Sequence, residues 1–552
     1  MEFLENNNFI NNKICDKKNN SNFEDDFNIE SNIEANSNIN NYNSIDECDT
    51  LDDNTSKKRI AKFLISNSFK AALSLLYYFI HDSCNIIIMG KQNNSHYISG
   101  FGIGMIFINA FGLSISIGYL SGMCTIISNA FGSNNMKLVG KHYVIGRVIV
   151  TLYLLLVFVP ITIFLSKYIF LLLSNFNDKI TIIAKNFSIS MIMSVIANLQ
   201  FIVLNNYLQS MNIFDPGMYI SLITIAFYPF LSYFVSFYLD YKEVGIGISS
   251  FILNLSNYAI LEIYNIKYNP YPESIIGPSN YNNYIEIYDT VNNNDSFNEV
   301  ETIKSPLIKN KVLYIHKYNY YISFIYYEIL KTKHLKNQLI LGLASAGIFI
   351  IEWIAYDFTN IIAAFMGNIE LASNTCFLNI ANNFFWLQIG INILLKMAIG
   401  HACGKKQENL IRNLLKVSMI TSLILSILFS LFYFTFNKII IEVYTEEKPV
   451  ALLMYKLTIT YFFYSFFYFY QNTLNGYLCG LGKQQMIFYI STSVFFFFNY
   501  PLIGVLCFFY GFGLVGMYNC FALSLFLISV IYTGYVKKLN LKQLIENNDF
   551  IN

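Results

Sequence analysis

Apolar runs of about 20 residues recur along this 552-residue chain, and they constrain its fold more than any other feature. Each run is long enough for a helix to cross a hydrocarbon core ~30 Å thick. Charged residues make up 13% of the chain, whereas soluble chains of this length carry roughly a quarter. The sequence therefore predicts a multi-pass integral membrane protein whose surroundings are the lipid bilayer.

The apolar runs fall into two groups of six, separated by a polar segment. The predicted spans are 63–90, 98–130, 141–166, 183–210, 216–239, 244–265, 339–366, 371–401, 410–436, 450–479, 484–510 and 512–535. We therefore predict an all-α polytopic membrane protein of about twelve transmembrane helices. These helices form two six-helix bundles related by pseudo-two-fold symmetry.

Polar segments set the boundaries of the predicted domains. Residues 1–60 are rich in Asn and acids and predict a disordered tail. Two six-helix bundles, 61–265 and 339–536, flank a linker at 266–338, and a short tail at 537–552 ends the sequence. Lys and Arg cluster beside the tails, the linker and the loops on the same side, which predicts that this side is cytoplasmic.

An internal repeat supports the two-bundle fold. Residues 206–210 match residues 476–480 at a shift of 270, and Asn129–Gly132 matches His401–Gly404 at a similar shift. Six spans per repeat is an even number, so both halves enter the membrane from the same side. The halves should then be related by an axis along the membrane normal, with a substrate site at their interface.

Several function classes are disfavoured. The formal net charge of +1 shows no global attraction to nucleic acid. The nine cysteines form no CxxC pair, so no metal centre is predicted. No P-loop, HExxH motif or nucleophile elbow occurs, and we predict neither a cofactor nor an enzyme.

Three acidic residues within the predicted spans are candidates for function: Asp82, Glu352 and Asp357. An ionised carboxylate at the bilayer centre costs about 3 kcal/mol on insertion scales. Burial favours the neutral form of a carboxyl group, and a proton carrier needs both forms. Trp353 and Tyr356 beside Glu352 suit a flat organic cation through cation–π contact.

Helix geometry separates the two acids of the seventh span. Glu352 and Tyr356 are one turn apart and share a face, whereas Asp357 lies about 140° around the helix from Glu352. Glu352 is thus the main candidate for proton and substrate binding, with Asp357 directed elsewhere. The alternative is that these acids only fix helix packing through neighbouring Asn, Ser or Tyr side chains.

Several motifs resemble the multidrug and toxin extrusion (MATE) family of cation-coupled antiporters. Residues 128–133 are similar to its Gln-Ala-Phe-Gly-Ala motif, and residues 400–404 to its Gly-Asn-Ala-Leu-Gly motif. Residues 351–357 resemble Glu-Trp-Trp-x-x-Glu of the eukaryotic branch, with Asp357 at the second Glu. Residues 478–484 resemble Leu-Arg-Gly-x-Gly-x-Gln, with Cys479 where Arg is common.

This resemblance covers about residues 60–265 and 338–535. It implies a cation-binding role for Asp82, which stands at the family's acidic position in span one. The sequence departs from the family pattern at Tyr228 and Ser232, where two polar residues, often Asn, are usual.

We therefore predict a monomeric secondary antiporter that exports organic cations, xenobiotics or small metabolites in exchange for protons or sodium. It would reside in the plasma membrane or an organelle membrane. The alternatives are a lipid-linked precursor flippase of the same superfamily, a receptor, or a membrane-embedded enzyme. An enzyme would need clustered polar side chains, whereas we predict that His142, His334 and His401 are isolated.

Overall fold

The computed structural model describes residues 51–90, 95–173, 178–268, 271, 274, 333–445 and 447–547. Most of the predicted N-terminal tail and central linker lies outside these residues. Within the described residues the chain forms helices and no strands. This agrees with the predicted class, because a helix satisfies all of its backbone hydrogen bonds without help from lipid.

The first bundle contains α-helices and short π-helical segments, which are labelled η. Its elements are α4 (Lys57–Gly90), α5 (Ser95–Phe107), η1 (Ile108–Ser114), α6 (Ile115–Gly132), α7 (Met136–Tyr153), η2 (Leu154–Phe158), η3 (Ile161–Leu165), α8 (Ser166–Leu173), α9 (Asp178–Ser190), α10 (Ile192–Ser210), α11 (Asp215–Tyr233), η4 (Phe234–Tyr238) and α12 (Lys242–Tyr268).

The second bundle has the same order of long helices. Its elements are α16 (Lys333–Met366), α17 (Asn368–Gly404), α18 (Glu408–Tyr444), α19 (Lys448–Gly480), α20 (Gln484–Val494), η6 (Phe495–Asn499), α21 (Tyr500–Ile503), η7 (Gly504–Phe509), α22 (Gly513–Lys538) and the short α23 (Leu541–Asn547).

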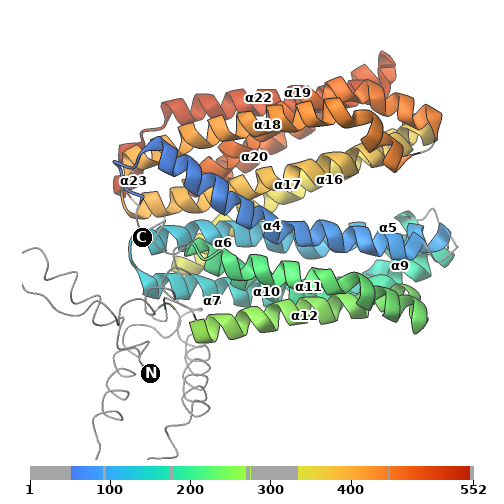
Figure 1. Ribbon diagram of the computed structural model, residues 1–552, viewed down its shortest axis with the longest axis horizontal. Helices are drawn as coiled ribbons and strands as arrows, with labels where there is room; N and C mark the ends of the chain where they lie inside the picture. Colours follow the sequence, from blue (N-terminus) through green and yellow to red (C-terminus); the bar gives the residue numbers. More distant parts are fainter. Residues whose placement is uncertain are drawn as a thin grey trace, which may run out of the picture. The chain divides into compact units, whose positions relative to one another are not determined.

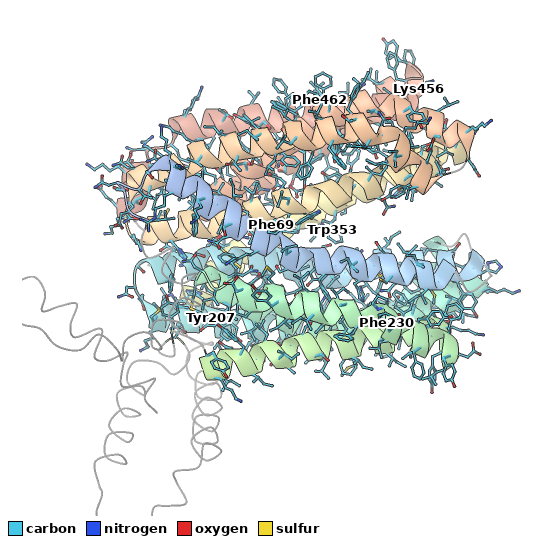
Figure 2. All side chains as sticks on the ribbon, viewed as in Figure 1. Phe69, Tyr207, Phe230, Trp353, Lys456 and Phe462 are labelled. Atoms are coloured by element: carbon cyan, nitrogen blue, oxygen red, sulfur yellow. The ribbon has the colours of Figure 1, made fainter. Side chains whose placement is uncertain are left out.

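Ten helices within the described residues are long and apolar enough to cross a membrane, and the bent pair α9–α10 makes an eleventh. α9 and α10 meet at 44°. α4 has 34 residues, about 50 Å at 1.5 Å per residue, and is the twelfth long helix of the fold. Large apolar side chains such as Phe230, which is 76% exposed, point outwards as expected for contact with lipid (Figure 2).

The first helix of each half contacts both bundles. α4 packs against α11 and α12 of its own half and against α17 and α18 of the other. α16 correspondingly packs against α20 and α22 of its own half and against α6 and α7 of the other. Figure 1 shows α4 passing from the second bundle to the first. This exchange of equivalent helices is what the predicted pseudo-two-fold symmetry requires.

Basic residues gather where α4, α7 and α18 begin and where α17 and α22 end. We call this the basic end; its residues are Lys57, Lys58, Arg59, Lys137, Lys141, Lys405, Lys406, Arg412, Lys537 and Lys538. The two bundles also approach each other closely along the part of α6 and α16 that leads to the basic end. A Cβ atom at Gly122 of α6 would lie 2.8 Å from Gly342 Cα of α16.

One sequence-based expectation needs correction. His142 and His334 are not isolated, because their rings meet edge to face with centroids 5.7 Å apart. Gln338 also contacts His142, because its Oε1 atom accepts a hydrogen bond from His142 Nδ1 at 2.7 Å. The sequence hid this contact because α7 and the start of α16 are almost 200 residues apart.

Candidate functional site

A small cavity lies inside the first bundle. Its volume is about 40 Å³, which accommodates a water molecule or a small cation. The polar side chains that line it come from four elements: Tyr77, Tyr78, His81 and Asp82 of α4, Asn109 of η1, Ser194 and Asn198 of α10, and Asn254 of α12. A carboxylate surrounded by neutral oxygen atoms is a suitable environment for a proton or a hard cation.

Asp82 lines this cavity and supplies its carboxyl group. Its side chain is 44% exposed, and its Oδ1 atom lies 3.1 Å from His81 Nδ1. His81 is buried, and its Nε2 atom lies 2.9 Å from the Ser250 hydroxyl of α12. The sequence predicted Asp82 as a site residue, and the structure adds His81, which directly contacts the carboxylate.

A buried hydrogen-bond network holds this histidine. The Tyr228 hydroxyl of α11 donates to Asn85 Oδ1 at 2.5 Å and lies 2.9 Å from Ser250 Oγ. Tyr228 thus stands beside the acid, at a position where the sequence departs from the MATE pattern. Pro229 follows it inside the helix, and Ser232 is fully buried one turn further on.

Two tyrosines extend the network to the far side of the cavity. Tyr77 donates to Asn254 Oδ1, and Asn254 Nδ2 donates to Ser194 Oγ at 2.9 Å. Tyr78 donates to Asn198 Oδ1 at 3.1 Å. Sequence reasoning missed these residues. The available signal was the spacing of Tyr77, His81 and Asn85, which places three polar groups on one face of a helix.

Glu352 lies near the middle of α16, in the second bundle. It is partly buried, and the side-chain amide of Gln471 on α19 lies beside its carboxyl group. Four tyrosine side chains lie within electrostatic range of this carboxyl group: Tyr356 of the same helix, Tyr464 and Tyr468 of α19, and Tyr532 of α22. The arrangement combines an acidic group with an aromatic wall.

The neighbours of Glu352 on α16 differ in their placement. Tyr356 is partly buried and stacks on Phe521 of α22, with the rings 12° from parallel and the centroids 6.3 Å apart. Trp353 is also partly buried, and Figure 2 shows it between the two groups of helices. The side chain of Asp357 lies outside the described part of the structure, so its predicted direction stays a prediction.

A family model described as MatE matches residues 71–261 and 344–505, which together exceed half of the chain. The chain belongs to the MatE family. The match covers both bundles and omits the predicted tail and linker. It confirms the relationship that the motifs around residues 128–133 and 400–404 indicated.

Related proteins agree with this membership. Multidrug and toxin extrusion protein 2 of Oryctolagus cuniculus is 21% identical over 445 residues, 80% of this chain and 65% of that protein. The protein of the same name from Mus musculus is 19% identical over 80% of this chain and 68% of its own length. This MatE chain thus spans about two thirds of the length of these relatives.

Solved structures show the same fold. The eukaryotic MATE transporter AtDTX14 superposes with a TM-score of 0.72 at 16% identity, covering 89% of this chain and 98% of that one. The Vibrio cholerae MATE transporter VcmN gives a TM-score of 0.68 at 15% identity, with 88% and 99% coverage. These similarities show that the chain has the fold of these MATE transporters.

Proposed function

We propose that this MatE protein is a secondary antiporter that exports organic cations in exchange for protons. The observation that carries the proposal is the environment of Glu352. A carboxyl group near the middle of a membrane helix needs a partner or a cavity, and here its surroundings are a neutral amide and four tyrosines. A proton or an organic cation can each neutralise it, so the two ligands compete.

The first bundle supports the proton as the coupling ion. The Tyr228 hydroxyl has one proton and donates it to Asn85 Oδ1. In the hydrogen bond between Tyr228 and Ser250, the Ser250 hydroxyl is therefore the donor. His81 Nε2 must then donate to Ser250. The bond between His81 Nδ1 and Asp82 needs a further proton, held by either group. The contact between His81 and Asp82 is thus one that a proton can bridge, held by either the imidazole or the carboxyl group.

A proton shared between His81 and Asp82 would disfavour sodium at Asp82. A sodium ion requires the carboxylate in its ionised form, and a protonated imidazole at 3.1 Å would repel the ion. We assign the basic end to the cytoplasm because Lys and Arg are enriched in cytoplasmic loops. In the proposal, the organic cation is exported from this cytoplasmic side.

The test is exchange in proteoliposomes with an imposed pH gradient and a fluorescent organic cation. Glu352→Gln keeps the shape of the side chain and removes its titratable proton. We expect exchange driven by the pH gradient to fall by about tenfold or more, in line with coupling free energies between two ligands. Insertion into the membrane should remain normal, because a neutral side chain is easier to insert than a charged one.

Glu442→Gln is the matched control, because Glu442 is exposed near the end of α18. It should exchange at the wild-type rate. Wild-type exchange with wild-type pH dependence in Glu352→Gln would contradict the role given to this carboxyl group. Replacing the proton gradient with a sodium gradient tests the ion, and equal exchange under sodium alone would contradict proton coupling. Movement of a lipid-linked substrate, with no movement of cations, would favour the flippase.

A further inference from the structure

A pair of buried side chains joins the two bundles near the basic end. Gln338, the sixth residue of α16, is fully buried. Its amide nitrogen donates to the His142 carbonyl at 3.2 Å, and its Oε1 atom accepts from His142 Nδ1 at 2.7 Å. His142 is 1% exposed and is the seventh residue of α7, about 9 Å along the helix from the basic end. Both hydrogen bonds cross from one bundle to the other, so they break if the helices separate here.

These two bonds determine which nitrogen of the imidazole carries the proton. A side-chain amide has one donor atom and one acceptor atom, and the nitrogen of Gln338 donates to the His142 carbonyl. The atom that meets Nδ1 is therefore the oxygen, which can only accept, so Nδ1 carries the proton. In the neutral ring, Nε2 then has only a lone pair. Nε2 is buried, and within the described part of the chain it has no hydrogen-bond partner.

A proton added to Nε2 would have no acceptor in this arrangement. The imidazolium would contain two N–H groups, and Gln338 satisfies one of them. A buried charge whose donors are incompletely paired is much less stable than the same charge in water. The closed contact thus favours the neutral ring, whereas the charged ring favours a state in which water reaches it.

The charged groups on the two helices that meet here are basic. The rings of His142 and His334 meet edge to face, with their centroids 5.7 Å apart. The basic residues in the first two turns of α7 and α16, besides His142, are Lys137, Lys141, Lys333, His334 and Lys336. Positive charge nearby opposes a further positive charge on the His142 ring.

The other helices that pack against α7 supply no compensating acid. α6, η2 and α10 contain neither acidic nor basic residues, and their titratable groups are those of Tyr119, Cys124 and Tyr207. Further along α7, Arg147 lies 3.9 Å from Glu262 of α12, so this carboxyl group already faces another cation. Protonation of the buried imidazole is therefore opposed by its surroundings as well as by its hydrogen bonds.

Other polar contacts also cross between the bundles. The Lys396 ammonium of α17 donates to the Ser121 hydroxyl of α6 at 2.8 Å. On the same helix, His401 Nε2 donates to the Ser210 carbonyl at 2.7 Å, and its Nδ1 lies 3.1 Å from Asn212 Nδ2. Asn212 Oδ1 has no partner among the described residues, so rotation of this amide would offer an acceptor to a protonated ring. This contact can therefore survive protonation, unlike the one between α7 and α16.

We propose that His142 and Gln338 form a pH-sensitive clamp, which keeps the basic end closed while His142 is neutral and opens it when His142 is protonated. The clamp goes beyond the proposed function, because it controls access at the basic end and involves neither Asp82 nor Glu352. It rests on the proposed function only for the orientation, in which the basic end is cytoplasmic. Acidification of the cytoplasm then opens this end to the organic cation.

The experiment measures the separation of the bundles as a function of pH. Spin labels are attached at Lys137→Cys on α7 and Asn409→Cys on α18, both exposed positions, in the full chain with its nine native cysteines replaced. Double electron–electron resonance in lipid nanodiscs gives the ratio of separated to closed molecules. An imidazole in water titrates at about pH 6.5. If only the separated state takes up the proton, the ratio should rise about tenfold between about pH 7.5 and about pH 5.5.

His142→Asn is the decisive variant, because its amide nitrogen can replace Nδ1 as a donor and cannot take up a proton. The ratio should stay low at both pH values. Gln338→Met removes both hydrogen bonds and should raise the ratio about tenfold at the higher pH. His96→Asn is the matched control, since His96 lies in the first turn of α5, at the opposite end of the first bundle. It should respond to pH as the labelled parent does.

A labelled parent whose ratio does not change with pH would overturn the clamp, as would a His142→Asn protein that keeps the full response. Loss of the response in His401→Asn but not in His142→Asn would also overturn it. If His142→Asn does not fold, a Gln338→Met protein with the ratio of the parent would overturn it.

These outcomes are separate from those for the proposed function, because the distances are measured without transport. If the distances stayed constant while a pH gradient still drove exchange, the clamp would fail and the proposed function would stand. If the distances followed pH while Glu352→Gln exchanged like the wild type, the proposed function would fail and the clamp would stand.

Discussion

The contact between α6 and α16 makes a quantitative prediction about stability. Alanine at Gly122 would place its methyl carbon 2.8 Å from Gly342 Cα and 2.8 Å from Gly342 N. Non-bonded carbon atoms prefer about 3.5–4.0 Å, so the helices would have to separate by about 1 Å. The opposing atoms belong to a backbone, and rotation of a side chain cannot relieve the overlap. Small residues at helix contacts are typical of membrane bundles.

Overpacking of this kind costs about 1–3 kcal/mol. We expect Gly122→Ala to lower the free energy of unfolding by this amount, and Tm by several degrees. The assay is thermal unfolding of the purified protein in detergent, followed by intrinsic fluorescence. Gly118→Ala should act similarly, because its methyl carbon would lie 2.5 Å from Ala346 Cα.

Gly102→Ala provides the control for helix propensity. No heavy atom lies within 4 Å of a Cβ built at Gly102, so this change adds a methyl group without a clash. Alanine is the better helix former by about 1 kcal/mol, and Tm should stay equal or rise. An equal Tm for Gly122→Ala and Gly102→Ala would refute the argument that these helices cannot separate without cost.

Two further substitutions test other contacts. Asp82→Asn should weaken the dependence of exchange on the pH gradient, and wild-type dependence in the proteoliposome assay would assign Asp82 to packing. Asp53→Ala removes the carboxylate that accepts from Leu410 N at 2.9 Å in the first turn of α18. Loss of such a cap costs about 1 kcal/mol, so Tm should fall slightly, and an unchanged Tm would show that the cap contributes nothing.

The membrane helices were predictable because lipid imposes one requirement on every span. A predicted span at 216–239 corresponds to α11 and η4, which end at Tyr238. The predicted span at 484–510 is one continuous path through α20, η6, α21 and η7. Hydropathy could not show the π-helical segments, since these depend on local packing. One of them matters for the site, because η1 contributes Asn109 to the cavity.

The acids were predictable and most of their partners were not. Glu352 and Asp82 stand out because a carboxyl group in an apolar run is costly. By the same rule Lys396 should have been selected, since it lies within the apolar sequence around residues 389–399. The partners of these groups are distant in sequence: Gln471 lies on another helix, and Ser121 is 275 residues from Lys396. Such contacts follow from helix packing, which a single sequence does not encode in any local pattern.

The internal repeat explains why one of its matched motifs lies where the two bundles meet. At the same shift, Asn129 corresponds to His401 and Gly132 to Gly404. A Cβ atom at Gly132 would lie 2.3 Å from His401 O, and one at Gly404 would lie 2.2 Å from Asn129 O. Each contact is the symmetry equivalent of the other, as at a two-fold interface in which one patch meets its own copy. Residues beside a two-fold axis contact their own counterparts, so a change in either half alters both contacts together. Small residues are required in both halves for the same reason, and this shared requirement preserves the match that the sequence shows.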